Sequence, residues 1–183
     1  MSTKSQDNDN ETNNNPDIDF DTRTIYLYTD VNSQIAKEIS RAISHFNQGK
    51  YPIYLYINSP GGDVAAMISI MASLKQSQNP IIIDITGEAD SAAAFIALCG
   101  TYTRMFKLGS MMFHKMWFTH IEGSTTEVEE INKNTQKTMK RIVKEMLKDK
   151  KITYAEFMDK MGEKDWTITP EEAKKYGFIN EIY

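Results

Sequence analysis

The chain has 183 residues, of which 40% are hydrophobic and 25% are charged, and its formal net charge is −4. This length suits one domain of ordinary size. The single cysteine, Cys99, excludes an intrachain disulfide and favours a reducing compartment, so we expect a cytoplasmic protein. No apolar run approaches the roughly 20 residues of a membrane helix. We therefore expect neither a membrane partner nor a signal peptide.

Negative charge is concentrated at the N-terminus. Residues 1–22 hold six of the 25 acidic residues but only one of the 21 basic residues, so this segment carries −5 and the remainder +1. It also holds five asparagines and only three apolar residues. We expect residues 1–22 to be a disordered acidic tail and residues 23–183 to form the folded domain. The near-neutral domain has no basic stripe, which argues against a nucleic-acid partner.

Strands and helices alternate along the first part of the domain. Runs of β-branched and aromatic residues predict strands at 24–28, 53–57 and 80–86. Helical spacing of apolar residues predicts helices at 35–46, 67–74 and 92–98, and a short apolar run follows at 111–113. Alternation with short connections predicts right-handed crossovers and a mostly parallel sheet, which is an α/β fold.

The last third of the chain is mostly helical. Seven apolar residues on one face predict a long helix over 127–147, about 30 Å in length. Two shorter helices follow, with predicted capping boxes at 153–156 and 169–172, and Gly177 is placed to end the second. The loop at 163–166 lies between these helices, a common place for a functional side chain.

Two turns carry groups that suit acyl-transfer chemistry. Ser91 follows a strand that is expected to end near Thr86 and precedes a helix. The N-terminus of a helix favours negative charge, and a serine nucleophile requires such a strand-to-helix turn. The alternative is that Ser91 simply caps the helix. Gly61 and Gly62 end another strand and could present a backbone N–H to a developing oxyanion, although an ordinary turn has the same sequence.

The histidines offer one candidate base and no metal site. His114 closes the apolar run 111–113, where it suits a general base, although a lone histidine at a strand end is more often structural. We expect His45 to be a surface or packing residue. Three scattered histidines and one cysteine lack metal-ligand spacing, and there is no phosphate-binding glycine loop. We therefore expect neither a metal nor a cofactor.

In combination, these segments resemble the proteolytic subunit of the Clp (caseinolytic) serine peptidases, from about Arg23 to the C-terminus. The strongest match, YLYINSPGG at 54–62, resembles the family's strand and oxyanion-hole turn. The further matches are the nucleophile segment at 87–95, the apolar pair and histidine at 112–114, the segment that begins with an aspartate at 165–173, and the helix exit at 176–179.

The resemblance implies a role for each matching residue. Ser91 would be the nucleophile, His114 the general base, and Asp165 the residue that orients the imidazole. The backbone N–H groups of Gly62 and Ala92 would form the oxyanion hole. The implied activity is that of an ATP-dependent-type serine endopeptidase, which hydrolyses unfolded polypeptides inside an oligomeric chamber.

The resemblance also implies a fold and an assembly. The family's fold is a crotonase-like (ClpP-like) spiral of ββα units, with a projecting handle helix at about residues 125–150. Its homo-oligomers are stacked heptameric rings joined by these handles. Tyr54 and Tyr56 match aromatic positions of the cleft on which an AAA+ unfoldase docks.

The residues leave three alternative functions open. Asp90 precedes the nucleophile, where the family usually has a small apolar residue; we expect Asp90 to cap the helix and to face away from the site. If it faces inward, a catalytically inactive pseudo-peptidase is the first alternative. A Ser–Lys peptidase that uses Lys107 or Lys115 is the second. A crotonase-like acyl-CoA enzyme, with Glu88 and Asp90 near the thioester, is the third.

Overall fold

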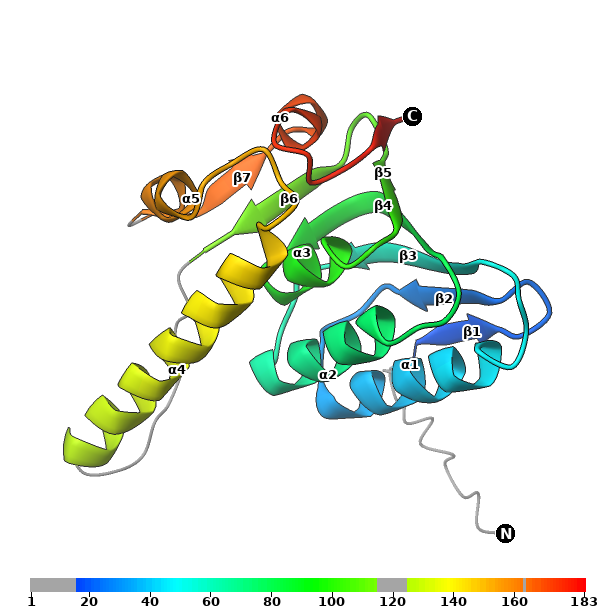
Figure 1. Ribbon diagram of the computed structural model, residues 1–183, viewed down its shortest axis with the longest axis horizontal. Helices are drawn as coiled ribbons and strands as arrows, with labels where there is room; N and C mark the ends of the chain where they lie inside the picture. The colour runs from blue at the N-terminus through cyan, green and yellow to red at the C-terminus, as the bar shows by residue number, and fades with distance from the viewer. Residues whose placement is uncertain (1–15, 115–124, 163) are drawn as a thin grey trace, which may run out of the picture.

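The computed structural model describes residues 16–114, 125–162 and 164–183 (Figure 1). The strands are β1 (Asp17–Asp19), β2 (Thr24–Leu27), β3 (Ile53–Ser59), β4 (Ile81–Asp90), β5 (Tyr102–Met105), β6 (Ser110–Phe113), β7 (Trp166–Ile168) and β8 (Glu181–Ile182). The helices are α1 (Ser33–Phe46), α2 (Val64–Lys75), α3 (Ala92–Ala97), α4 (Thr125–Met146), α5 (Tyr154–Met161) and α6 (Pro170–Lys175).

The described strands form one sheet in the order β1-β2-β3-β4-β5-β8, and every pair in it except β1–β2 is parallel. The long strand β4 changes partners along its length. Its first part pairs with β5, and Glu88 to Asp90 pair with β6, which in turn pairs with β7. The predicted α/β fold with a mostly parallel sheet is therefore confirmed.

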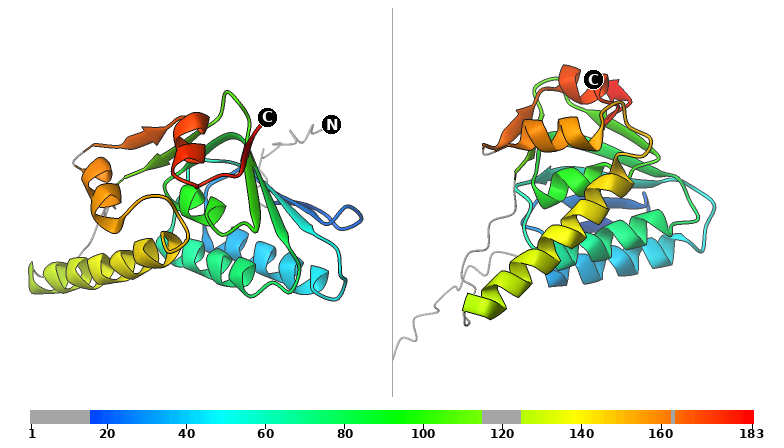
Figure 2. Two further views of the ribbon diagram at one scale, coloured as in Figure 1. Left: turned by 45° about the horizontal axis from the view of Figure 1, so that its top comes forward. Right: turned by 60° about the vertical axis from the view of Figure 1, so that its left-hand side comes forward.

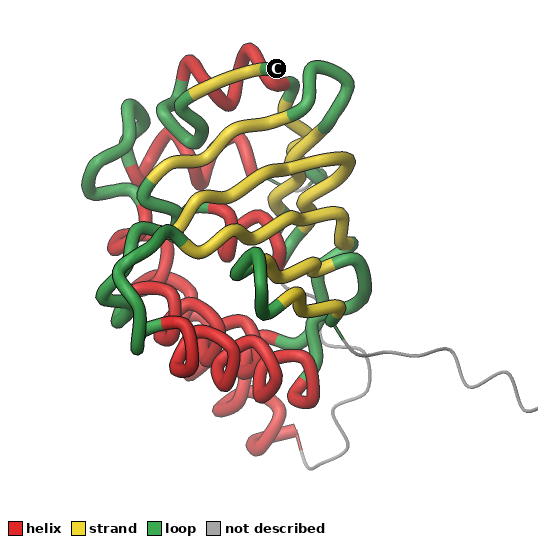
Figure 3. The backbone as a smooth tube through the Cα atoms, turned by 90° about the vertical axis from the view of Figure 1, so that its right-hand side faces the viewer, coloured by secondary structure: helices red, strands yellow, loops and turns green. Residues whose placement is uncertain are grey.

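One face of the main sheet is covered by helices and the other is left open (Figure 3). α1 presents Ile35, Ile39, Ile43 and Phe46 at helical spacing, and all four are at most 2% exposed. α2 packs beside α1 on the same face, and α3 lies next to α2 (Figure 1). This layering leaves the alternate residues of the strands, among them Tyr54 and Tyr56, on the open face.

α4 projects from the body of the molecule (Figures 1 and 2). Its C-terminal end packs on the core, where Val143, Met146 and the following Leu147 are buried. Ile131, nearer the free end, is 42% exposed. The observed helix agrees with the long helix predicted from the sequence, but the apolar face continues beyond the part that the chain's own core covers.

The N-terminal expectation is wrong for the residues that the structure describes. Asp17 to Asp19 pair with β2, and the ring of Phe20 packs 5.3 Å from that of His45 and 5.7 Å from that of Phe46. Partly buried Ile18 packs against the core. The few apolar residues of this segment are therefore enough to fix its end to the domain. Residues 1–15 lie outside the described part.

Three local expectations also need correction. β4 extends to Asp90 instead of ending near Thr86, because its last residues pair with β6. β5 had no counterpart among the strands predicted from apolar runs. Thr153 accepts a hydrogen bond from the Glu156 N–H, but the reciprocal bond that completes a capping box is seen only for Thr169 and Glu172.

Within the described ranges, no helix is long and apolar enough to cross a membrane.

Candidate active site

Ser91 stands at a strained junction between β4 and α3. Its φ of 52° and ψ of −116° lie in a region that residues with a side chain rarely adopt. Its N–H donates to the Met112 carbonyl at 2.8 Å, which fixes the junction to β6. The Ser91 side chain makes no capping hydrogen bond to α3. Ser91 is therefore the N-cap residue of α3 without the side-chain bond of an ordinary cap. Its backbone has the sharp strand-to-helix turn that exposes a nucleophile.

The turn at Gly61 and Gly62 lies directly against Ser91. Both glycines have positive φ, 92° and 146°. A Cβ atom on Gly61 would lie 2.8 Å from the Ala92 nitrogen and 2.9 Å from the Ser91 Cβ, so only glycine permits this approach. The turn is held from its other side, because Val31 N–H donates to the Gly61 carbonyl and Asp63 N–H donates to the Val31 carbonyl, both at 2.7 Å.

Two backbone donors of these two turns have no hydrogen-bond acceptor among the described residues. The N–H groups of Gly62 and Ala92 donate to nothing in the part of the chain that the structure describes. Ala92 opens α3, so its N–H also lies at the positive end of that short helix. Two free amides beside a hydroxyl are the arrangement that an oxyanion hole requires.

Strand register brings His114 and Asp165 to the same place. In the antiparallel pair of β6 and β7, Phe113 is opposite Trp166, so the next positions outward are His114 and Asp165. Directly opposed residues of such a pair have Cβ atoms about 4.5–5.5 Å apart. His114 also follows by two residues the Met112 carbonyl that holds Ser91. The backbone therefore places His114 and Asp165 just beyond the paired residues of β6 and β7, at the end of β6 that also holds the Ser91 N–H.

The expectation for Asp90 is wrong. Asp90 belongs to β4 and does not cap α3, and its Oδ1 is buried without a hydrogen-bond partner in the described residues. It is the register partner of Met112, which places its side chain on the face that carries His114. Burial first, and then the charges of Glu88 and Asp165, raise the pKa of Asp90, whereas His114 opposes this rise. Asp90 thus faces the site.

The open face of the sheet carries a row of four residues, of which only Tyr56 was predicted from the sequence. Register places Tyr26, Tyr56, Asp84 and Arg104 side by side on β2, β3, β4 and β5. The rings of Tyr26 and Tyr56 stack with centroids 5.2 Å apart. Arg104 binds both carboxylate oxygens of Asp84, with the Nη2–Oδ2 pair at 2.8 Å. An aspartate within the apolar run 80–86 was the signal that could have revealed this pair.

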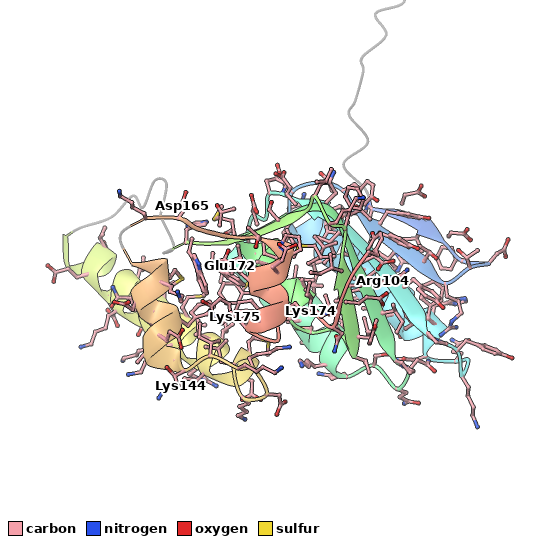
Figure 4. All side chains as sticks on the ribbon, turned by 90° about the horizontal axis from the view of Figure 1, so that it is seen from above. Arg104, Lys144, Asp165, Glu172, Lys174 and Lys175 are labelled. Atoms are coloured by element: carbon pink, nitrogen blue, oxygen red, sulfur yellow. The ribbon has the colours of Figure 1, made fainter. Side chains whose placement is uncertain are left out.

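This row is remote from the catalytic candidates. In Figure 4, Arg104 and Asp165 lie on well-separated parts of the molecule. Tyr54, which is 37% exposed, lies on the same face of β3 as Tyr56. The two predicted tyrosines therefore belong to one aromatic surface around the Asp84–Arg104 ion pair, separate from Ser91.

The remaining candidates lie away from Ser91 or outside the described residues. Lys107 precedes β6, at the end opposite to His114, and Lys115 lies outside the described residues. A search of the described ranges finds no group of three or more histidine, cysteine, aspartate or glutamate side chains that could hold a metal ion. His45 is an exposed residue of α1 that packs against Phe20, as expected for a surface residue.

Comparison with known proteins gives one consistent result. The family model described as Clp protease matches residues 8–183. "ATP-dependent Clp protease proteolytic subunit 3" of Synechococcus sp. (strain CC9605) is 28% identical over 164 residues, covering 87% of this chain and 82% of the relative. "ATP-dependent Clp protease proteolytic subunit 2" of Prochlorococcus marinus (strain NATL2A) is also 28% identical over the same shares of both chains.

Proposed function

The chain belongs to the Clp protease family, and we propose that it is a serine endopeptidase that cleaves unfolded polypeptides with Ser91, His114 and Asp165. Its fold is the crotonase-like spiral that the sequence resemblance implied. The observation that carries the proposal is the strained backbone of Ser91, whose φ is 52°, held against Gly61 and next to two amides, those of Gly62 and Ala92, that donate to no described residue. Strain of this kind persists where the surrounding structure imposes it, most often at active sites.

In the first half of the reaction, Ser91 Oγ attacks the carbonyl carbon of the scissile peptide and His114 takes the hydroxyl proton. The carbonyl oxygen becomes an oxyanion that accepts hydrogen bonds from the N–H groups of Gly62 and Ala92. The C–N bond then breaks, His114 returns its proton to the leaving amine, and an acyl-enzyme remains on Ser91.

In the second half, a water molecule attacks the acyl carbon and gives a proton to His114. The bond to Ser91 Oγ breaks, His114 protonates Oγ, and the carboxylic acid product leaves. Asp165, which lies one residue beyond the register pair Phe113–Trp166 as His114 does, orients the imidazole and stabilises its charged form.

The decisive test joins covalent labelling with peptide cleavage. A fluorophosphonate probe should label the full-length protein at Ser91, and a fluorogenic peptide should be cleaved. Ser91→Ala should lose both, with the cleavage rate reduced about 10⁶-fold because the triad acts as a unit. Ser44→Ala, which removes an exposed hydroxyl of α1 far along the chain from the site, is the matched control. An unlabelled and inactive wild-type protein contradicts the proposal.

One observation favours a second candidate, the catalytically inactive pseudo-peptidase. The carboxyl of Asp90 lies among the charges of the site, and a negative charge there opposes the formation of an oxyanion. Such a subunit would act by joining a ring with active partners. The same probe separates the two candidates, since a pseudo-peptidase stays unlabelled in the wild-type protein.

The assembly that we propose is a homo-oligomer of stacked rings joined through α4. The projection of this helix and the exposure of Ile131 near its free end support that arrangement, because the apolar face continues past the chain's own core. Heptameric rings are the expected size from the resemblance. Native mass spectrometry of the full chain tests the subunit number directly.

For the aromatic surface around Tyr54 and Tyr56, we propose docking of an AAA+ unfoldase. Its support is the exposed and stacked tyrosine face on the open side of the sheet, and the relatives' names include the words ATP-dependent. Tyr54→Ala should weaken ATP-driven degradation of a folded protein and leave the cleavage of short peptides unchanged. We also propose a cytoplasmic location, as the single cysteine predicts.

A further inference from the structure

The projecting helix α4 carries an apolar stripe that its own subunit leaves partly uncovered (Figure 2). The stripe consists of Val128, Ile131, Thr135, Met139 and Ile142. At about 100° per residue, these positions lie within about 40° of one line along the helix. Met139 and Ile142 pack partly against the core, but no member of the stripe is fully buried, and Ile131 is 42% exposed. One subunit therefore leaves a surface that a partner can cover.

The spacing of the apolar stripe is the same when it is read from either end. Counted from Thr135, the other members stand four and seven residues away on each side. If a second α4 runs antiparallel with Thr135 opposite Thr135, Ile131 of one copy therefore lies against Met139 of the other. The same register places Val128 against Ile142. A contact between identical chains about a two-fold axis requires this kind of self-complementary surface.

Charge along α4 is segregated in a way that favours the same antiparallel direction. Residues 125–132 hold three acidic residues and no basic one, whereas residues 133–144 hold five basic residues and no acidic one. Within the described ranges, Glu129, Lys140 and Arg141 form no ion pair. Packed helices lie about 8–10 Å apart, which is within the Debye length of about 10 Å at 0.1 M salt. Antiparallel packing therefore sets each acidic end beside the basic part of the other copy, and parallel packing would set like charges side by side.

The helix dipole does not account for this segregation of charge. The dipole favours acidic residues in the first turn and basic residues in the last turn, and its effect falls off beyond those turns. Lys133 and Lys137 lie in the middle of α4, and Lys137 is four residues from Arg141 as well as from Lys133. Like charges at this spacing destabilise a single helix. A facing acidic end offsets that cost.

Resting on the proposed stacking of rings through α4, we propose that each α4 pairs with α4 of a second copy of this chain, antiparallel and with the two-fold axis at Thr135. The apolar stripe forms the contact and sets its register. The segregated charges set its direction, because only the antiparallel pair brings opposite charges together. The partner of this surface is thus the same surface on another subunit.

The first experiment places a cysteine on the proposed two-fold axis. In Thr135→Cys, the two thiols meet within reach of a disulfide, for which the Cα atoms must lie about 4.4–6.8 Å apart. Val128→Cys is the matched control, because the proposed register separates the two Val128 positions by about 21 Å along the helix. Mass spectrometry after mild oxidation of the full-length protein measures the rate of disulfide formation between chains. The native Cys99 is buried, at 5% exposure, so it does not compete.

Thr135→Cys should form the interchain disulfide about 100-fold faster than Val128→Cys, because thiols held at a contact have an effective concentration of about 1 mM against micromolar protein in solution. Equal rates for the two variants overturn the proposed register. The absence of a disulfide in Thr135→Cys overturns it as well.

The second experiment tests the direction of the pair by reversing charge. Lys140→Glu with Arg141→Glu removes most of the positive charge that faces the acidic end, so association between rings should weaken by about 10-fold at about 0.1 M salt. A parallel pair would instead associate more tightly, because its repulsion between basic parts is relieved. Native mass spectrometry over a dilution series measures the association. Lys37→Glu with Arg41→Glu is the matched control, since it makes the same change at exposed positions of α1.

Raising the salt concentration separates the effect of charge from a loss of packing. At about 1 M salt the Debye length falls to about 3 Å, and the reversed variant and the wild-type protein should then associate equally. Unchanged or tighter association of the reversed variant at low salt overturns the antiparallel direction. Neither experiment reads catalysis, so a paired and cross-linked but inactive protein supports the inference and overturns only the proposed peptidase function.

Discussion

Gly61 and Ser91 touch so closely that a Cβ atom on Gly61 would lie 2.9 Å from the Ser91 Cβ and 2.8 Å from the Ala92 nitrogen. Gly61→Ala must therefore displace either the nucleophile or the turn. We expect fluorophosphonate labelling at Ser91 to slow by about 10²-fold, since a displacement of about 1 Å costs this much in well-oriented sites. The rate of labelling under fixed probe concentration is the measurement.

Gly177→Ala is the control for backbone strain alone. Gly177 also has a positive φ, 73°, but the nearest atom to an added Cβ is 3.6 Å away. We expect a loss of about 1 kcal/mol in unfolding free energy and unchanged labelling. Equal labelling rates in Gly61→Ala and Gly177→Ala would show that the contact with Ser91 does not position the nucleophile.

The Asp84–Arg104 ion pair should matter more for stability than for catalysis. The Asp84 side chain is 3% exposed and that of Arg104 is 37% exposed, so Arg104→Met leaves a buried carboxylate without its partner. We expect Arg104→Met to lower the free energy of unfolding by about 2 kcal/mol, below the full cost of breaking a buried pair because Arg104 is partly solvated. Urea denaturation measures the change.

The double variant tests the cause of that loss. Asp84→Leu with Arg104→Met removes both charges, and replacing a buried pair by apolar residues is often neutral. We expect most of the lost stability to return, with labelling at Ser91 unchanged throughout because the pair lies far from Asp165 (Figure 4). A double variant as unstable as Arg104→Met alone would contradict this account.

The sequence was sufficient to predict local structure wherever a short motif determines the backbone conformation by itself. A glycine pair after a strand and a serine before a small-residue helix indicated the turn at Gly61 and the turn at Ser91 separately, and only the family resemblance implied that the two act together. The orientation of Asp90 could not be predicted, because it depends on whether β4 ends at Thr86 or continues to pair with β6. The side chain of Asp90 points in one direction if the residue belongs to a strand and in another if it caps a helix.

Pairing between strands that are far apart in the sequence could not be predicted either. Asp84 and Arg104 meet because β4 and β5 pair in one particular register, and a shift of one residue would place Arg104 on the other face. The same reason explains β1, where Asp17 to Asp19 are polar enough to suggest disorder but pair with β2. The apolar Ile18 and Phe20 were the only local signals for that strand.

The exposed part of α4 provides a test of the proposed stacked rings. Ile131 is 42% exposed, so Ile131→Glu should change the unfolding free energy of the subunit by less than about 0.5 kcal/mol. At an interface between handles, the same charge would be buried at high cost. We expect native mass spectrometry to show particles of half the wild-type mass. The neighbouring Glu130→Gln is the control, and an undiminished mass for Ile131→Glu would exclude this contact.

Cys99 should make stability fall at alkaline pH. Its thiol is 5% exposed and lies 3.8 Å from the sulfur of Met146, and burial raises its pKa from 9.0 to about 11. The unfolded thiol ionises near pH 9, whereas the folded thiol stays neutral until about pH 11, so the unfolded state gains stability within this window. Between pH 9 and pH 11, the free energy of unfolding should fall by about 2 kcal/mol more in the wild-type protein than in Cys99→Ala. Urea denaturation at pH 8, 9, 10 and 11 measures both proteins, and the comparison removes the contributions of lysines and tyrosines that they share. Parallel pH dependence of the two proteins would mean that the thiol ionises equally easily in both states.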